Sequence, residues 1–335
     1  MVSEVMDFVA YWAASRILLT GGNPYSIETV FALQKSIGLQ AATPLLMWNP
    51  PWTLSFILPF GSVDFATSQF LWLVVSIFII LLSAVKLWQI YGNPPQSRKP
   101  WLLAFTFAPT LFVLVFGQIS PIILLGLTAF LYFEQKQNWA GAGLALALLS
   151  IKPHFVYLFW IALSLWIWQR RQWRILLVAA VAWIIAAAIP LLFDPTIYSQ
   201  YLEVLQTTTL PTPLELPAPT LRNALRSFAA IHSPIAGNLP TFIGVVWIVI
   251  FWFRNRVDWQ WAERLPLILL VSLTTTAYTW TFDQVALLPA LIQGATWLGA
   301  RKLGWRRWIG VAIYCAINST YLVAKLFIVI DAPYF

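Results

Sequence analysis

Charged residues are scarce in this sequence. Only 10% of its 335 residues are Asp, Glu, Lys or Arg, whereas 60% are hydrophobic and 16% are aromatic. A soluble protein of this length needs a far more polar surface. Apolar stretches recur along nearly the whole chain, as a helical protein that crosses a membrane several times requires. The composition therefore predicts an all-α polytopic membrane protein with about ten transmembrane helices, several of them short.

Cysteine and histidine are almost absent. A single cysteine, Cys315, leaves no partner for a disulfide within this sequence, and two distant histidines argue against a structural zinc site. The motifs GxxxxGK[ST], GxGxxG and HExxH are missing. No Asp-x-Asp pair is present either, so the usual metal site for a nucleotide-sugar diphosphate is lacking. We therefore expect no metal and no cofactor.

The net charge of +8 reflects membrane topology rather than nucleic-acid binding, because the basic residues lie in short clusters between apolar stretches. If the spans alternate strictly, one side carries most of them, and we expect that side to be cytoplasmic. That side holds Lys86, Arg98, Lys99, Lys136, Arg170, Arg171, Arg174, Arg254, Arg256, Arg264, Arg301, Lys302, Arg306 and Arg307, and the other holds Arg16, Lys35, Lys152, Arg222, Arg226 and Lys325.

Two amphipathic helices are expected before the first full span. Residues 4–20 place Glu4, Asp7, Tyr11 and Ser15 on one stripe, and Gly21-Gly22 supplies a left-handed stop. Ser26 can cap a second helix over about 27–37. Helices of this kind lie on a membrane surface rather than crossing it.

The rest of the chain divides into modules within a single domain, 1–335. We expect outer surface helices over 1–49, a core of short spans over 50–193, a proline-rich outer loop over 194–239 and C-terminal spans over 240–335. Pro59 and Gly61 should break the apolar element that runs from Pro50 to about Tyr91, and whether 50–62 crosses separately stays open. The remaining spans are expected at 101–116, 119–133, 139–151, 155–169, 173–193, 240–254, 264–280, 285–299 and 307–326.

The side opposite the basic clusters carries a coherent set of polar residues. Ionisable groups near membrane depth are costly and are therefore functional candidates. Each also has a simpler structural explanation. An acid can lie on the water-exposed face of a surface helix, a lysine can extend to the membrane interface, arginines can bind lipid headgroups, histidines can pack, and an acid can cap a turn. The candidates are Asp7, Gln118, Lys152, His154, Arg222, Arg226, His232 and Asp283.

An ordered set of short motifs resembles one known family. Asp7-Phe8 with Tyr11, Gly22-Asn23-Pro24-Tyr25 and Pro50-Pro51 look like the first outer loop of glycosyltransferase family 87, membrane enzymes of the GT-C superfamily that include polyprenyl-phosphate-mannose-dependent mannosyltransferases. The match continues through Gly117-Gln118, Ile151-Lys152-Pro153, Leu221–Leu225 and Tyr278–Pro289. In that superfamily a first span precedes the surface helix. Only six residues precede Asp7 here, so we expect that span to have been cut off or lost.

The resemblance implies a hexosyltransferase that uses a lipid-phosphate donor. A polyprenyl-phosphate sugar, such as mannose, would be transferred with inversion to a hydroxyl of a glycan or glycolipid, on the extracytoplasmic face of the plasma (inner) membrane. Asp7 would be the general base. Arg222, Arg226 and Lys152 would neutralise the leaving phosphate, which then needs no metal. Tyr11, Tyr25, Gln118, His154, Trp280 and Asp283 would line the acceptor and donor pocket.

Three other functions fit parts of the pattern. An O-antigen-ligase-like enzyme also has many spans and an outer loop with Arg and His, but needs no acid on an N-terminal helix. A lipid-sugar transporter or flippase needs polar groups near the midplane and often has paired repeats, and no repeat is evident. A non-catalytic lipid-binding subunit stays open because we expect the first span to be cut off or lost.

Overall fold

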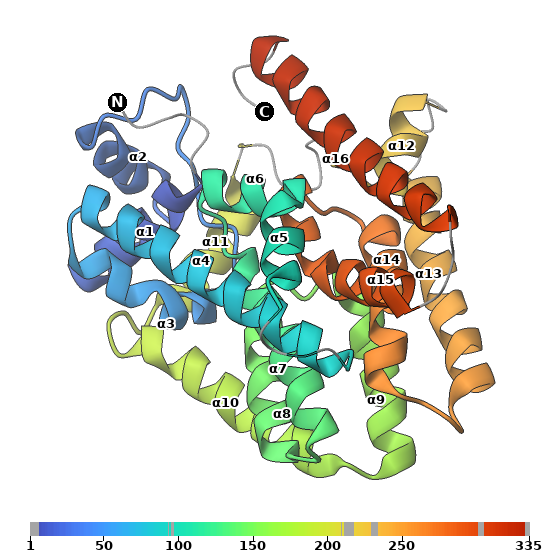
Figure 1. The fold of residues 1–335 in the computed structure, drawn as a ribbon. Coiled ribbons are helices and arrows are strands. Elements are labelled where there is room, and N and C mark those ends of the chain that lie inside the picture. Colours follow the sequence, from blue (N-terminus) through green and yellow to red (C-terminus); the bar gives the residue numbers. More distant parts are fainter. Residues whose placement is uncertain are drawn as a thin grey trace.

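The computed structural model describes residues 7–92, 94, 97–208, 210, 218–228, 234–300 and 305–331. Within these ranges the chain forms sixteen α-helices and three short 3-10 helices, and no β-strand (Figure 1). Buried apolar side chains from α1 to α11 and from α13 to α15 form one shared core. The predicted all-α architecture is confirmed.

The element order follows the chain as drawn in Figure 1. The elements are α1 (Phe8–Leu19), α2 (Ile27–Ser36), η1 (Pro51–Thr53), α3 (Leu54–Ile57), η2 (Leu58–Ser62), α4 (Phe65–Ile90), α5 (Lys99–Thr106), α6 (Ala108–Phe116), α7 (Ser120–Gln135), α8 (Trp139–Leu149), α9 (Tyr157–Arg170), α10 (Trp173–Leu191), α11 (Ile197–Thr207), α12 (Leu221–Phe228), α13 (Pro234–Asn255), α14 (Trp261–Thr275), η3 (Thr281–Leu287), α15 (Leu288–Ala300) and α16 (Arg306–Asp331).

Three helices in the described part are long and apolar enough to cross a membrane. They are α4, α10 and the Gly237–Asn255 part of α13, and the bent pair α5–α6 makes a fourth if it counts as one span. Other apolar helices, including α7 and α8, are shorter than the ~20 residues that cross a bilayer unaided. The structure thus confirms a polytopic membrane protein with several short helices, and the expected number of ten spans stays a prediction.

The span expected over 101–116 is broken in two. α5 and α6 meet at an angle of 65°, and Phe107 between them is extended, with ψ of 113°. Pro109 is the physical reason, because a proline has no N–H to donate to the preceding turn and its ring clashes with the carbonyl four residues earlier. After this break, α6 runs in a new direction and ends at Gly117.

The two N-terminal helices differ in their exposure. α2 begins as predicted, because the Ser26 hydroxyl accepts from the Thr29 N–H at 3.3 Å. Gly21, with φ of +78°, confirms the left-handed stop after α1. In contrast, the polar stripe of α1 does not face water: Tyr11 and Ser15 are buried, because α1 lies against η2, α3, α2 and α4. The expected wet face of this helix is therefore wrong for these two residues.

The segment over 50–62 is a short, broken piece, as Pro59 and Gly61 predict. A Cβ at Gly61 would lie 2.6 Å from the backbone N of Arg16, so only glycine lets this piece approach α1 so closely. Ser55 donates to the Ala186 carbonyl at 2.5 Å on the other side, which joins the piece to α10. At 1.5–2 Å per residue it reaches roughly 20 Å, short of a ~30 Å hydrocarbon core. Its length favours the alternation of spans that we assumed.

The region over 194–239 contains more regular structure than its composition suggests. α11 and α12 lie within it, and α13 begins at Pro234 rather than at 240. Tyr198 donates to the Ala187 carbonyl at 2.8 Å, and Tyr201 donates to the Trp48 carbonyl at 3.2 Å. These contacts hold α11 against α10 and against the segment before η1.

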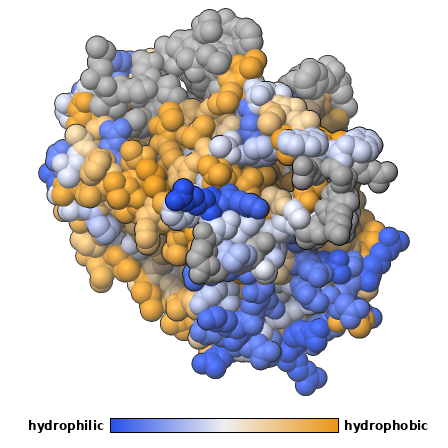
Figure 2. All heavy atoms as spheres, in the orientation of Figure 1, coloured by the Kyte–Doolittle hydropathy of each residue, from blue (hydrophilic) through white to orange (hydrophobic). Residues whose placement is uncertain are grey.

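Basic residues gather at one end of the molecule. Figure 2 shows polar side chains over the ends of α8 and α9 and apolar side chains over α4 and α10. The ends of α9 and α13 lie side by side there. Arg170 donates to the Val257 carbonyl at 3.3 Å, and Gln169 donates to the Arg256 carbonyl at 3.4 Å. The basic end is the side that the charge distribution predicts to be cytoplasmic.

Residues 172 and 199 flank the candidate span α10 and test this topology. In a Cys315→Ser background, we expect a membrane-impermeant thiol reagent added outside intact cells to label the Ser199→Cys variant and not the Gln172→Cys variant. Both positions are at least partly exposed, so permeabilised cells should label both and serve as the control. The reverse pattern would overturn the orientation.

Candidate functional site

Five polar side chains from four distant parts of the sequence form one hydrogen-bonded network. The Lys152 Nζ donates to Asp283 Oδ1 at 2.8 Å and to Gln118 Oε1 at 3.1 Å. Gln118 Nε2 donates in turn to Asp7 Oδ2. Tyr11, one helical turn after Asp7, donates to Gln118 Oε1 at 2.9 Å. Five of the residues predicted for the site therefore meet.

Gly117 brings α1 and Gln118 together. It ends α6 in the left-handed conformation, with φ of +65°, and the Gln118 N–H donates back to the Val113 carbonyl at 3.0 Å. A Cβ at Gly117 would lie 2.6 Å from the Phe8 Cβ, so the glycine is also needed for close packing. Trp72 donates its indole N–H to the Gly117 carbonyl at 2.8 Å and stacks on Phe8. Asp7, next to Phe8, is thus held beside Gln118.

The turn that carries Lys152 is held by the Trp48–Trp52 segment and by α14. Asn49 donates to the Ile151 carbonyl at 3.3 Å, and Trp52 donates to the Ser150 carbonyl at 3.2 Å. On the other side, Thr276 donates to the His154 carbonyl at 2.9 Å. The two prolines after Asn49 start the 3-10 helix η1, which keeps Asn49 and Trp52 on the side of this turn.

Asp283 lies in η3 and is fully buried. Its Oδ2 accepts from the Trp280 N–H at 3.0 Å, and its Oδ1 accepts from Lys152 and from the Ser120 hydroxyl. The Lys152 ammonium also lies 5.2 Å from the centre of the Phe282 ring. Within the described residues, Lys152–Asp283 is the only ion pair.

The partners of Gln118 determine the orientation of its amide. Tyr11 and Lys152 can both donate, so the amide oxygen must face them. The amide NH₂ then faces the Asp7 carboxylate. Burial, with the charges of Asp7 and Asp283 adding to it, raises the pKa of Tyr11 well above its usual value, so its hydroxyl stays a donor. Gln118 therefore links the buried ion pair to Asp7 through bonds of defined direction.

The two acids differ in what a substrate can reach. Asp283 has both carboxylate oxygens engaged and no exposed surface. Asp7 is partly exposed at the start of α1. Asp7 thus keeps some solvent-exposed surface, whereas Asp283 is enclosed by Lys152, Ser120 and the backbone of η3.

His154 stacks on Tyr278 beside this network. The two rings lie 4.1 Å apart and nearly parallel, and the Tyr278 hydroxyl is 3.4 Å from His154 Nδ1. Burial lowers the pKa of His154 to about 4, with Asp283 opposing the shift and Lys152 adding to it. His154 is therefore neutral at physiological pH, and its Nε2 has no hydrogen-bond partner among the described residues.

The other predicted pocket residues are placed around the network rather than in it. Tyr25 packs against Tyr201 with ring centres 5.2 Å apart. Trp280 stacks on Phe282 and donates its backbone N–H to Asp283. Sequence reasoning did not single out Ser120 and Tyr201. Ser120 lies two residues after Gln118, at the start of α7. Its closeness to Gln118 in the sequence was the one feature that could have predicted its place in the site.

Arg222 and Arg226 lie on α12, which packs against α13 and α14. Arg222 donates to Asn238 Oδ1 at 3.0 Å, and its Nε has no partner among the described residues. No hydrogen bond in the described part joins either arginine to the Asp7–Asp283 network. His232 lies outside the described residues. In the described part, no three His, Cys, Asp or Glu side chains cluster as metal ligands would.

Comparisons with known proteins agree with the family that the sequence motifs resemble. The model of glycosyltransferase family 87 matches residues 47–230, more than half of the chain. This stretch includes Gln118, Lys152, Arg222 and Arg226, whereas Asp7 and Asp283 lie outside it. No solved structure matches.

The chain is also similar to two curated proteins from Mycobacterium tuberculosis, strains CDC 1551 and H37Rv. Both are named α-(1→3)-arabinofuranosyltransferase. Each is 27% identical over 302 residues, which cover 82% of this chain and 64% of the relative. The chain thus spans about two thirds of the length of these relatives.

Proposed function

Because the chain belongs to glycosyltransferase family 87, we propose that it transfers a sugar from a polyprenyl-phosphate donor to a hydroxyl of a glycan or glycolipid. The observation that carries this proposal is the contrast between the two acids. Asp283 is buried in an ion pair with Lys152, whereas Asp7 is partly exposed and is oriented by Gln118. An accessible carboxylate held in place is what deprotonation of an acceptor hydroxyl requires.

The proposed reaction is a single displacement. Asp7 takes the proton of the acceptor hydroxyl as that oxygen bonds to the anomeric carbon of the donor. The bond from this carbon to the phosphate oxygen breaks, and polyprenyl phosphate leaves with the electron pair. Since the attack comes from the face opposite the leaving group, the anomeric centre inverts. Asp283, whose oxygens are both engaged, is not placed to form a covalent sugar–enzyme intermediate.

The leaving phosphate needs positive charge, which α12 offers. Arg222 and Arg226 lie at i and i+4 on one face of this helix, and a pair of guanidinium groups matches the geometry of phosphate oxygens. α14, against which α12 packs, ends just before the segment that carries Tyr278 and Asp283. Lys152 was also predicted to bind phosphate, but its ammonium already donates to Asp283, Gln118 and Ser120. We assign it a positioning role instead.

The donor sugar and the side of the membrane belong to the same proposal. The sequence motifs point to mannose or another hexose, and the names of the two relatives add an arabinofuranosyl donor. The network lies at the start of α1 and directly after α6 and α8, and the basic residues gather around the ends of α9 and α13. With the basic end in the cytoplasm, the site faces the extracytoplasmic side.

The donor class can be tested with the purified protein. We expect binding and turnover of a labelled polyprenyl-phosphate sugar, offered as the mannosyl and the arabinofuranosyl form in parallel, and no turnover of nucleotide sugars. Arg222→Ala and Arg226→Ala should each lose charge-assisted contacts of roughly 1.5–3 kcal/mol in donor binding. The corresponding Lys variants should recover only part of it, since lysine lacks the bidentate fork.

Arg98→Ala is the matched control, because it removes an exposed arginine at the start of α5. Donor affinity should stay within error in this variant. Equal donor affinity in the wild type and in the Arg222→Ala/Arg226→Ala protein would remove α12 from the phosphate site. Transfer from a nucleotide sugar but not from the lipid-linked sugar would overturn the donor class.

A further inference from the structure

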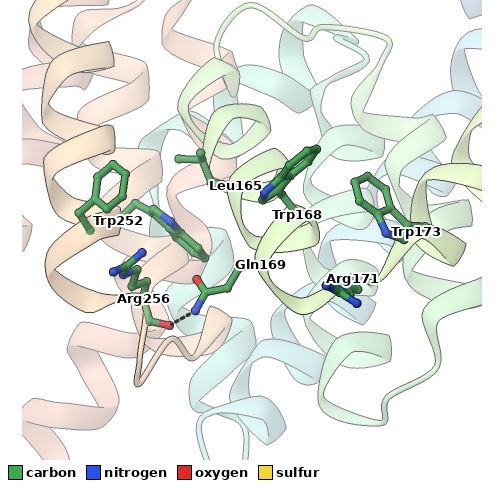
Figure 3. Close-up of a pocket in the computed structure, with 8 residues that line it drawn as sticks. Leu165, Trp168, Gln169, Arg171, Trp173, Trp252 and Arg256 are labelled. Atoms are coloured by element: carbon green, nitrogen blue, oxygen red, sulfur yellow. Dashed lines mark hydrogen bonds between the residues drawn. The ribbon is translucent and has the colours of Figure 1, made fainter.

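A groove of about 750 Å³ lies at the basic end of the molecule, away from the network around Asp7. It is formed where α9 ends, α10 begins and α13 ends (Figure 3). Its polar lining comes from Arg171, Gln169 and Arg256, and its apolar lining includes Trp168, Trp173 and Trp252. Figure 3 shows Arg256 and Arg171 on opposite sides of Gln169. The proposed sugar transfer does not use this groove.

The two charged residues that line the groove, Arg171 and Arg256, are both positive. No acidic residue lines it. Arg171 and Arg256 are exposed, and neither is in an ion pair in the part of the chain that the structure describes. Arg170, Arg174 and Arg254 surround the same helix ends and add to the field. Such a concentration of arginines favours an anionic group bound between them.

The groove lies where two candidate spans begin or end. α10 starts at Trp173, and the apolar part of α13 ends at Asn255. Trp168 and Trp173 pack edge to face, with 74% and 48% of their surfaces exposed. Exposed tryptophans at the ends of membrane helices lie at the level of lipid headgroups. The arginines of the groove are therefore at the depth of the phosphate groups of one leaflet.

Backbone and side-chain contacts hold the groove in shape. Gln169 Nε2 donates to the Arg256 carbonyl at 3.4 Å, and Arg170 donates to the Val257 carbonyl at 3.3 Å. Arg171 ends α9 in the left-handed conformation, with φ of 56°, which turns the chain into α10. The two helix ends that carry the arginines are thus fixed to each other before a ligand binds. This preorganisation lowers the entropic cost of binding.

We propose that this groove binds the headgroup of an anionic phospholipid. The headgroup lies in the groove that Arg171 and Arg256 line, and the acyl chains run along the exposed apolar faces of α10 and α13. Leu176 and Leu177 on α10 and Ile250 on α13 are exposed on these helices. The shape, charge and depth of the groove match a lipid better than a free anion, because apolar surface continues from it. This site is independent of the sugar donor.

Retention of lipid by the purified protein tests the proposal. Native mass spectrometry would measure the binding of phosphatidylglycerol and phosphatidylcholine to the wild type, to Arg171→Gln/Arg256→Gln and to Arg98→Gln/Lys99→Gln. The last variant removes the same charge from the start of α5 and serves as the control. We expect the groove variant to bind phosphatidylglycerol at least about tenfold more weakly than the control variant, the scale of one charge-assisted contact. Phosphatidylcholine binding should change little.

Two results would overturn the site. An equal loss in both double variants would mean that charge attracts the lipid without a specific site. Soluble glycerol phosphate that binds the groove as tightly as phosphatidylglycerol would mean a free-phosphate site without a role for the acyl chains. Thermal unfolding of each variant checks the fold. If the double variant is unfolded, phosphatidylglycerol binding is compared between Arg256→Gln and the wild type instead.

Discussion

Replacing Asp7 by Asn is expected to reduce sugar transfer by at least about two orders of magnitude while the protein still folds and binds the lipid-linked donor. Proton removal by a positioned side chain is worth roughly 100- to 10,000-fold in rate. Asn keeps the size of Asp and can still bond to the Gln118 amide through its oxygen, so the packing around Phe8 and Gly117 should survive. The loss should therefore fall on kcat rather than on donor binding.

Turnover of a labelled polyprenyl-phosphate sugar onto a hydroxyl acceptor gives the rate, and donor binding is measured separately. Asp194→Asn is a suitable control, because Asp194 is an acid of the loop before α11 whose carboxylate accepts hydrogen bonds from Thr196 and Gln200 nearby. It should keep near-normal transfer. Near-normal transfer by Asp7→Asn would rule out Asp7 as the base and shift weight to the ligase-like mechanism.

Local signals in the sequence predicted much of the fold correctly. The Ser26 cap, the stop at Gly21 and the break at Pro59 and Gly61 each depend on a few neighbouring residues, and each is found in the structure. Composition alone predicted a helical membrane protein. These features are readable because turn geometry and hydrophobic runs are properties of short stretches.

The misses depend on contacts between distant segments. The periodicity of α1 suggested a wet face, but η2 and α4 cover the stripe, which no local pattern could indicate. Lys152 was predicted as a site residue, but its pairing with Asp283 was not, because the pair joins positions far apart in the chain. Arg222 and Arg226 were expected near the other site residues, and within the described part no hydrogen bond joins them to the network.

The donors and acceptors of the network are ordered from Lys152 to Asp7, and this order assigns a role to the buried Lys152–Asp283 pair. Lys152 donates to Asp283 and to the Gln118 oxygen, which leaves the amide NH₂ for Asp7. Asp283 thus holds Lys152, Lys152 orients Gln118, and Gln118 positions the carboxylate that a substrate can reach. Under this interpretation the ion pair does not touch the substrate, and its effect on transfer passes through Gln118.

Breaking the ion pair from one side is the second prediction with a large effect. Lys152→Met leaves the Asp283 carboxylate buried without its cation, and Asp283→Leu leaves the ammonium buried without its anion. Each should lower the free energy of unfolding by roughly 3–5 kcal/mol, because an uncompensated buried charge is strongly destabilising. Thermal or denaturant unfolding in detergent measures the loss. The double variant should be more stable than the sum of the two single losses implies, by about 2 kcal/mol or more.

Kinetics of the double variant separate a positioning role from a merely structural one. It regains a neutral interior, but the Gln118 oxygen has lost the ammonium that orients it. We therefore expect donor affinity close to that of the wild type and a kcat that stays at least about tenfold lower, the scale of one lost charge-assisted hydrogen bond. Native kcat in a folded double variant would show that the ion pair only stabilises the fold. A selective loss of donor affinity would instead return Lys152 to the phosphate site.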